Sequence, residues 1–167
     1  MTPTTPPAPG TSRQRNRKKA LGVIQQVAAL PYRTYPDGSP SAPFVLLITS
    51  RQTGRWVVPK GNMMVGKAPH EAAAIEAEEE AGVKGIISPL PVGRYRYTKL
   101  LAGGGSVIAE VELFPLAVTE VRKKWIEMDQ RKRRWFAIGE AAAVVDEVEL
   151  GELINLFGEG RGPRPVG

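Results

Sequence analysis

The chain has 167 residues, no cysteine and a formal net charge of +6 at pH 7. This length predicts one domain, and the lack of cysteine excludes disulfides, a thiol nucleophile and a thiolate metal site. No apolar run approaches the ~20 residues of a membrane span and the N-terminus lacks the apolar core of a secretory signal, so we expect a cytoplasmic protein without a membrane partner.

The positive charge is concentrated at the N-terminus. Residues 1–19 contain five basic residues and no acidic one, which accounts for all but one unit of the net charge. We therefore predict a disordered basic tail over 1–16, one domain over 17–157 and a flexible C-terminal tail over 158–167. The tail is either a solvated segment or an electrostatic arm for phosphates or nucleic acid, whereas the body of the chain is not expected to bind nucleic acid.

The first half of the domain predicts strands separated by turns. Ala20–Leu30 predicts a strand, although so short a run containing alanine is also compatible with a helix. Pro31–Pro43 is rich in turn residues. Phe44–Ser50 predicts a buried strand, and Gln52–Gly54 makes a turn into Arg55–Val58, so that these two strands form a hairpin.

A helix is predicted directly after a glycine-containing loop, within the segment Gly61–Val83. Pro69 suits the first helical position, where its missing N–H is no loss, and Gly82 suits the stop. The alanines between them are strong helix formers, and those on one face can pack closely against a sheet.

Three glutamates of this helix, Glu76, Glu79 and Glu80, share one face at about 100° per residue. Carboxylates three and four residues apart repel one another by roughly a few tenths of a kcal/mol per pair. A divalent cation such as Mg²⁺ would offset this repulsion, because hard cations take carboxylate oxygens together with substrate phosphate oxygens. The alternative is an acidic helix face that is simply solvated.

The second half of the domain alternates strands and turns before it ends in a helix. The predicted elements are strands over Lys84–Leu90 and Gly93–Lys99, a turn over Ala102–Gly105, a strand over Val107–Val118, a charged connection over Thr119–Gln130, a strand over Arg134–Ala137, and a helix over Ile138–Phe157 with a break near Gly151. Arg94 and Arg96 alternate along their strand and therefore share one face. Mixed strands with one helix in mid-chain and another near the end predict an α/β/α layered domain.

The segment 61–83 resembles the sequence box of Nudix hydrolases, in which a glycine is followed at fixed spacing by four glutamates and a second glycine. The positions that match in register are Gly61, Glu76, Ala77, Glu79, Glu80, Gly82 and Val83. Two positions depart, because Lys67 stands at the first box glutamate and Ile75 at the box arginine. In the family the glutamate and the arginine at these two positions commonly pair and brace the loop against the helix. Because both are replaced in this chain, neither is left without its ion-pair partner.

The resemblance extends over roughly Lys18 to Phe157, and it implies both a fold and a reaction. The fold is the Nudix fold, an α/β/α sandwich with a mixed central sheet and the box loop and helix. The reaction is the hydrolysis of a phosphoanhydride with Mg²⁺ or Mn²⁺ as cofactor. By the resemblance, Glu76 and Glu80 would bind the metal together with the backbone carbonyl of Lys60, and Glu79 or Glu80 would hold or deprotonate the attacking water, with Glu79 also near the metal.

Two further segments are similar to the diphosphoinositol polyphosphate phosphohydrolases. One is Ile48–Arg51 followed after a short turn by Arg55–Pro59, and the other is Arg131–Phe136 before the last helix. Such enzymes cleave highly phosphorylated small molecules, for which several arginines and lysines near the metal make chemical sense. The resemblance implies substrate contacts from Lys18, Lys19, Ser50, Arg51, Gly61, Arg131 and Arg133, and more loosely from Arg94, Arg96 and Lys99.

Two alternatives remain open. A dinucleoside polyphosphate substrate would need an aromatic platform for adenine, for which Tyr95 and Tyr97 are the candidates. A non-catalytic phosphate-ligand or RNA-binding protein on a Nudix scaffold is favoured by Lys67, by Ile75 and by the basic tail. The retained glutamates argue against it, because a dead site gains little from repelling carboxylates.

Overall fold

The computed structural model of the chain describes residues 2, 22–34 and 42–160. The predicted basic tail, together with Lys18 and Lys19, therefore lies outside the described residues except for residue 2, as do residues 161–167 of the predicted C-terminal tail. None of the helices that the described residues form is long and apolar enough to cross a membrane.

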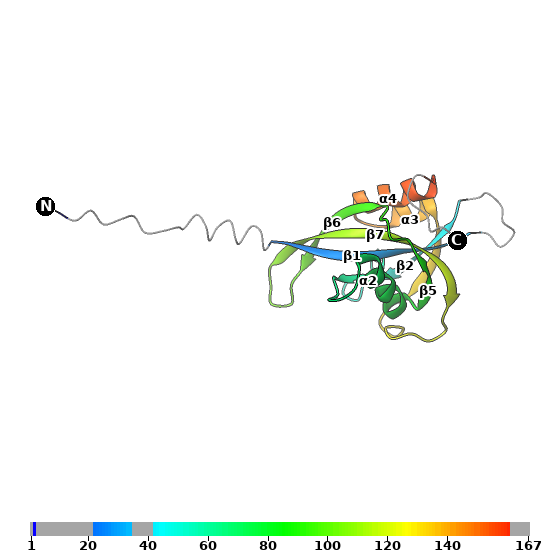
Figure 1. Ribbon diagram of the computed structural model, residues 1–167, viewed down its shortest axis with the longest axis horizontal. Helices are drawn as coiled ribbons and strands as arrows, with labels where there is room; N and C mark the ends of the chain where they lie inside the picture. The colour runs from blue at the N-terminus through cyan, green and yellow to red at the C-terminus, as the bar shows by residue number, and fades with distance from the viewer. Residues whose placement is uncertain (1, 3–21, 35–41, 161–167) are drawn as a thin grey trace.

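Eight strands in the described part of the chain form one mixed sheet, and helical segments cover both of its faces (Figure 1). The strands are β1 (Val23–Arg33), β2 (Phe44–Thr49), β3 (Trp56–Val57), β4 (Lys60–Asn62), β5 (Val83–Ile87), β6 (Gly93–Leu100), β7 (Ser106–Val121) and β8 (Arg133–Ala137). The helical segments are α2 (Pro69–Glu76), the π-helix η1 (Ala77–Ala81), α3 (Ile138–Val144) and α4 (Val148–Gly158).

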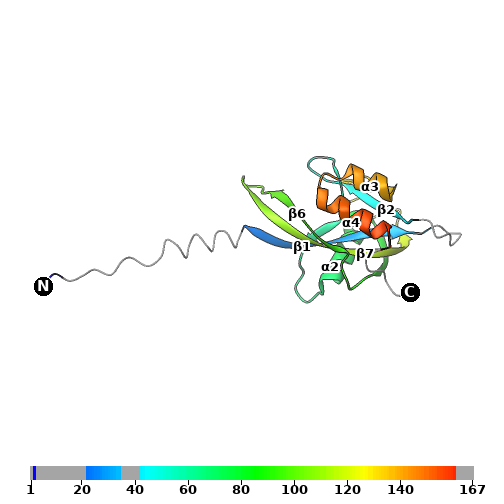
Figure 2. The same ribbon diagram turned by 90° about the horizontal axis from the view of Figure 1, so that it is seen from above.

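The long strand β1 lies at the centre of the sheet. β7 runs parallel to it, from Val23 opposite Ile108 to Tyr32 opposite Ala117. On the other edge, β4 pairs antiparallel with residues 26–28 of β1, and β2 pairs antiparallel with its far end. The strand order is β3-β2-β1-β7-β5, with β8 beside β2 and β6 beside β7. Figure 2, which labels β1, β2, β6 and β7, shows the sheet from the side that α3 and α4 cover. The ambiguous run is thus a strand, because neighbours on both edges use its backbone groups.

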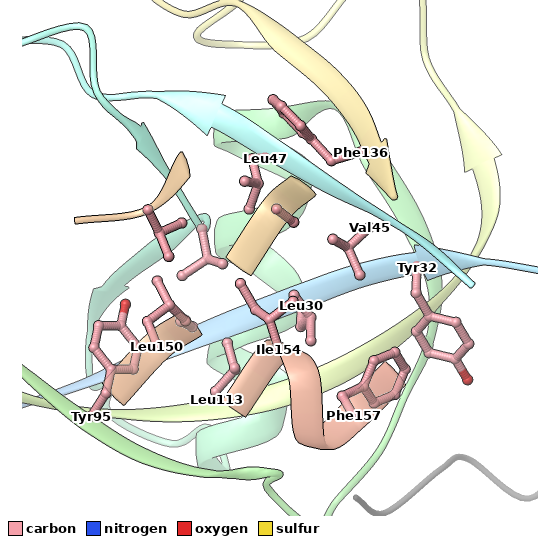
Figure 3. Packing of buried hydrophobic residues seen from close by; sticks show 14 of the residues in the cluster. Leu30, Tyr32, Val45, Leu47, Tyr95, Leu113, Phe136, Leu150, Ile154 and Phe157 are labelled. Atoms are coloured by element: carbon pink, nitrogen blue, oxygen red, sulfur yellow. The ribbon is translucent and has the colours of Figure 1, made fainter. Parts of the chain in front are cut away.

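Successive residues of β1 point to opposite faces, which divides the core into two clusters. Ala28 and Leu30 belong to the cluster that packs against α3 and α4, whereas Val27 and Ala29 belong to the cluster that packs against α2 and η1. Figure 3 shows the larger side chains of the first cluster, which are Leu30, Tyr32, Val45, Leu47, Tyr95, Leu113, Phe136, Leu150, Ile154 and Phe157. The predicted α/β/α sandwich with a mixed sheet is confirmed.

The last helix breaks at a different place from the one predicted. Residues 145–147 separate α3 from α4, and Val145 is extended with φ −78° and ψ 143°. Gly151 lies inside α4 instead, where a Cβ atom would come within 2.9 Å of the carbonyl oxygen of Ala142. The glycine therefore permits a close approach of the two helices rather than a break in the chain.

Candidate active site

The predicted glutamate-bearing helix forms and lies close against the sheet. It begins at Pro69, and the side chain of Glu71 accepts a hydrogen bond from the backbone N–H of Ala68 at 3.2 Å. The alanines at positions 72, 73, 77 and 81 are fully buried against the sheet. At Gly82 the backbone turns left-handed with φ 66°, which suits glycine and ends the helix as predicted.

The last turn of this helix is the π-helix η1. Its wider turn determines which of the three predicted glutamates point in the same direction. The N–H of Gly82 is shared between the carbonyl of Ala77, five residues earlier, and that of Glu78, 3.1 Å away. Because a π-helix closes its hydrogen bonds over five residues rather than four, each residue turns through a smaller angle than in an α-helix. Side chains four apart, Glu76 and Glu80, therefore align more closely, while Glu79 turns toward the flank.

Glu76 and Glu80 face a cavity of about 310 Å³ between the helix, β4, β6 and the connection before β8. Of the described residues, those that line it are Gln26, Arg51, Lys60, Gly61, Asn62, Glu76, Glu80, Tyr97, Lys99, Glu127 and Arg131. The cavity thus combines three carboxylates with four cationic side chains, which is suited to a ligand that carries both a metal ion and phosphates.

Glu80 is held in place by two donors. It is 3% exposed. Its carboxylate accepts a hydrogen bond from the backbone N–H of Lys60 at 3.3 Å and lies 3.2 Å from Nη2 of Arg131. Burial raises the pKa of Glu80 to about 7, against the opposing effect of the Arg131 charge. Its negative charge is therefore only partly compensated.

Glu76 approaches the backbone of β4 directly at Gly61. A Cβ atom at Gly61 would collide with the carboxylate of Glu76, so any larger residue here would have to displace that carboxylate. Burial, followed by repulsion from Glu80 and Glu79, raises the pKa of Glu76 to about 7. The box glycine, predicted as a substrate contact, thus makes room for a carboxylate.

Glu79 lies on the flank of the helix instead of in this cavity. With Ile75 and Glu78 it lines a neighbouring cavity of about 530 Å³, whose far wall includes Arg122 and Trp125. It still lies close enough to Glu76 to raise that residue's pKa. Direct metal binding or catalysis by Glu79 stays a prediction, and the geometry favours Glu76 and Glu80 over it.

The residues present fit a divalent cation held by two carboxylates. Among residues 22–34 and 42–160, no three acidic or histidine side chains converge closely enough to form a metal site by themselves. Glu76 and Glu80 nevertheless offer carboxylate oxygens that line one cavity together, and burial raises the pKa of both to about 7. Mg²⁺ characteristically uses one or two carboxylates and takes its other ligands from water and substrate phosphates.

Glu127 is a cavity residue that the sequence did not predict. Its side chain is 15% exposed and lies 3.1 Å from Nε of Arg131. The residue falls in a charged connection without any periodic pattern, so no face could be assigned to it. The one local signal is the spacing of four between Glu127 and Arg131, which is typical of an ion pair.

The predicted phosphate contacts Ser50, Arg51, Lys99 and Arg131 come together around a second cavity of about 260 Å³. It shares Arg51, Lys60, Tyr97, Lys99 and Arg131 with the first cavity, and none of the described residues that line it is acidic. The ammonium of Lys60 lies 5.0 Å from the centre of the Tyr97 ring, and burial lowers its pKa. A ligand could therefore extend from the carboxylates into a basic recess.

Arg94 and Arg96 do not line either of these cavities. Along β6, Tyr95, Tyr97 and Lys99 share one face, and the two arginines occupy the other face together with Thr98. Arg96 pairs with Glu110 at 2.9 Å, and Arg94 lies 3.6 Å from Glu110 and from Glu112. Their substrate contacts stay a prediction that the geometry does not favour, because both arginines lie on the face away from these cavities and pair with cross-strand carboxylates.

Arg133, another predicted substrate contact, does not line either of these cavities. Its guanidinium donates to the carbonyls of Ala81 and Gly82 at 2.9 and 3.4 Å and to that of Arg122 at 2.6 Å. These bonds place it at the end of the helix, away from the cavity. Arg131, two residues earlier, does reach the cavity, where it is bound by Glu80 and Glu127.

No family model matches the chain. The chain is 30% identical over 148 residues to Nudix hydrolase 21, chloroplastic, of Arabidopsis thaliana, covering 88% of this chain and 72% of the relative. It is 35% identical over 126 residues to diphosphoinositol polyphosphate phosphohydrolase 3-alpha of Mus musculus, covering 74% and 70%.

Solved structures share the fold. The C. elegans Ap4A hydrolase superposes with a TM-score of 0.57 at 20% identity, covering 83% of this chain and 98% of that chain. A Nudix hydrolase from Nitrosomonas europaea superposes with a TM-score of 0.60 at 18% identity, covering 83% and 90%.

Proposed function

This chain belongs to the Nudix hydrolase family, and from that premise we propose that its substrate is a diphosphoinositol polyphosphate or a similarly phosphorylated small molecule. Members of the family hydrolyse phosphoanhydride bonds and generally use divalent metals. The chain is therefore a pyrophosphohydrolase of phosphorylated small molecules, which sets aside the alternative of a non-catalytic binding protein. Glu76 and Glu80 would hold the metal, Mg²⁺ or Mn²⁺.

The observation that carries the proposed substrate is the basic recess beside the carboxylates. Arg51, Lys60, Lys99 and Arg131 line both cavities, so the two cavities are neighbours that share these four charges. A ligand with many phosphates needs several cations at once, with forked pairing from arginine and point charges from lysine. The similarity to the mouse phosphohydrolase, whose name states such a substrate, supports the same assignment.

Each group has a distinct task in this proposal. The metal ion, when bound, neutralises phosphate oxygens and lowers the pKa of the attacking water. Glu80 and Glu127 face the cavity and can accept a proton from water there. Arg51 and Lys99 stabilise charge on the phosphates beyond the bond that is cleaved.

A dinucleoside polyphosphate is the second candidate, and the structure offers it little support. Tyr95, one of the two predicted platforms for adenine, is 2% exposed and belongs to the core. The hydroxyl of Tyr97 donates to Gln26 at 2.6 Å, and its ring lies beneath Lys60. Of the two tyrosines, only Tyr97 lines the cavity.

The test compares phosphate release from an inositol pyrophosphate and a dinucleoside pentaphosphate, each with Mg²⁺ and with Mn²⁺. Lys99→Ala should raise KM for the inositol pyrophosphate by roughly 10- to 100-fold, the equivalent of one charge-assisted hydrogen bond. Arg96→Ala is the matched control on the same strand and should leave KM unchanged, because Arg96 lies on the opposite face. Preference for the dinucleotide, or equal effects of the two variants, would contradict the proposed substrate.

A further inference from the structure

The C-terminal end of the glutamate-bearing helix is capped by a distant segment, residues 122–133. The last carbonyls of a helix have no partners within it and must find them elsewhere. Four successive carbonyls at this end accept hydrogen bonds from the segment. The carbonyl of Glu79 accepts from the backbone N–H of Glu127 at 3.1 Å, and that of Glu80 from the indole N–H of Trp125 at 3.0 Å. The carbonyl of Ala81 accepts from the guanidinium of Arg133 at 2.9 Å, and that of Gly82 from the backbone N–H of Arg122 at 2.8 Å. One segment thus supplies hydrogen-bond donors to all four of these carbonyls.

Arg133 holds this cap together. Its guanidinium bonds both the helix end at Ala81 and the capping segment at the Arg122 carbonyl, and it lies 3.8 Å from the centre of the Trp125 ring. A Cβ atom at Gly82 would lie 2.8 Å from both Trp125 and Arg133, so the contact leaves no space for another side chain. A positive charge at a helix C-terminus is also favourable electrostatically.

The same segment forms a wall of the cavity. Between Trp125 and Arg133 it carries Glu127 and Arg131, and Arg131 pairs with Glu80 at 3.2 Å. The position of the segment therefore fixes Glu80 twice, through its main-chain carbonyl and through its carboxylate.

We infer that residues 122–133 form a clamp that fixes the position of Glu80 in the cavity, with Trp125 and Arg133 as its positioning residues. The clamp braces the C-terminal end of the helix, whereas the pair that Lys67 and Ile75 replace would brace the loop against the helix. Ile75 lines a cavity with Trp125, Ile126 and the charged residues Glu78, Glu79, Arg122 and Lys124. The inference rests on the proposed metal site at Glu76 and Glu80.

Arg133→Lys tests the clamp while keeping the positive charge. A lysine lacks the planar fork and cannot bond Ala81 and Arg122 together in the same geometry. We expect Mn²⁺ affinity, measured by electron paramagnetic resonance of free Mn²⁺, to fall by roughly 10- to 100-fold, as when outer partners of a metal site are removed. We also expect faster hydrogen exchange at the amides of Gly82 and Glu127, a lower kcat and an unchanged KM.

Arg134→Lys is the matched control, because Arg134 is 57% exposed and pairs with Glu140. It should leave Mn²⁺ affinity and exchange unchanged. Trp125→Phe removes the indole N–H bond to Glu80 and reduces the ring contact with Arg133. It provides a second variant should Arg133→Lys fail to fold, and a smaller loss of Mn²⁺ affinity is expected.

Two results would overturn the clamp. A raised KM with unchanged Mn²⁺ affinity and unchanged exchange would make Arg133 a substrate contact. Wild-type exchange rates at Gly82 and Glu127 in both variants would show that the helix end does not depend on these residues. If the wild-type protein itself bound no Mn²⁺, the proposed metal site would fail, and the exchange rates would still decide the clamp.

Discussion

Replacing Glu80 with glutamine should stabilise the metal-free protein while it abolishes turnover. The pKa of Glu80 rises from an ordinary value of 4.5 to about 7 on folding, so its protonated form is favoured in the folded state. The stability that this gives is present below pH 4.5 and is lost as the pH rises through about 7. Glutamine mimics the protonated acid at every pH and should not share this loss.

The size of the effect follows from the pKa difference. The shift corresponds to at most about 3 kcal/mol at pH 8, since one pKa unit is worth ~1.4 kcal/mol. Arg131 loses the charge of one of its two carboxylate partners, so we expect a gain of about 1–2 kcal/mol in the free energy of unfolding at pH 8 and little change at pH 4.5. Catalysis should fall by more than the roughly 10- to 100-fold caused by losing an outer partner of a metal site.

Urea unfolding with EDTA at pH 4.5 and pH 8 measures this gain, with phosphate release assayed on the same samples. Glu152→Gln, at an exposed position of α4, is the control and should change neither stability nor turnover. A loss of stability at pH 8, or a change of equal size at both pH values, would refute the reasoning about Glu80.

Three further predictions address neighbouring groups. Gly61→Ala should lower kcat and Mn²⁺ affinity about tenfold or more with the fold retained, because the new Cβ displaces the carboxylate of Glu76. Circular dichroism checks the fold and a Mn²⁺ titration checks the affinity. Wild-type Mn²⁺ affinity in the variant would contradict the prediction. Mn²⁺ should bind more tightly at pH 8 than at pH 6, because Glu76 and Glu80 both have a pKa of about 7 and must lose their protons to bind metal. Calorimetric titration at the two pH values measures the difference. Equal Mn²⁺ affinity at both pH values would contradict the prediction. Arg55→Ala should lower the free energy of unfolding by about 1–3 kcal/mol, since it leaves the carboxylate of Glu147 without the arginine 3.4 Å away. Urea unfolding at pH 8 measures this change. Unchanged stability would show that water replaces the ion pair.

The sequence predicted those parts of the fold that depend on the backbone preferences of single residues. Pro69 and Gly82 fix the ends of the helical segment through backbone geometry, which does not depend on the rest of the chain. The alternation along β6 correctly placed Arg94 and Arg96 on one face. Which face that is depends on how β6 pairs with β7, so their partner Glu110 could not be foreseen.

The candidate site was predictable for the residues that the box resemblance carries, and less so elsewhere. The departure of Glu79 toward the flank follows from a π-turn, which no local pattern in this segment signals. Glu127 and Arg133 depend on a connection of charged residues that folds back over the helix end. Within the basic run before α3, spacing alone could not show that Arg131 enters the cavity whereas Arg133 caps a helix.

The central claim is that Glu76 and Glu80 together hold the divalent cation that hydrolysis requires. The most direct measurement is a Mn²⁺ titration of the wild-type protein and of the Glu76→Gln/Glu80→Gln double variant, followed by phosphate release from an inositol pyrophosphate with the same samples. We predict that the wild-type protein binds Mn²⁺ and releases phosphate only in its presence, while the folded double variant does neither. A double variant that still bound Mn²⁺ with wild-type affinity and turned over substrate would contradict the claim.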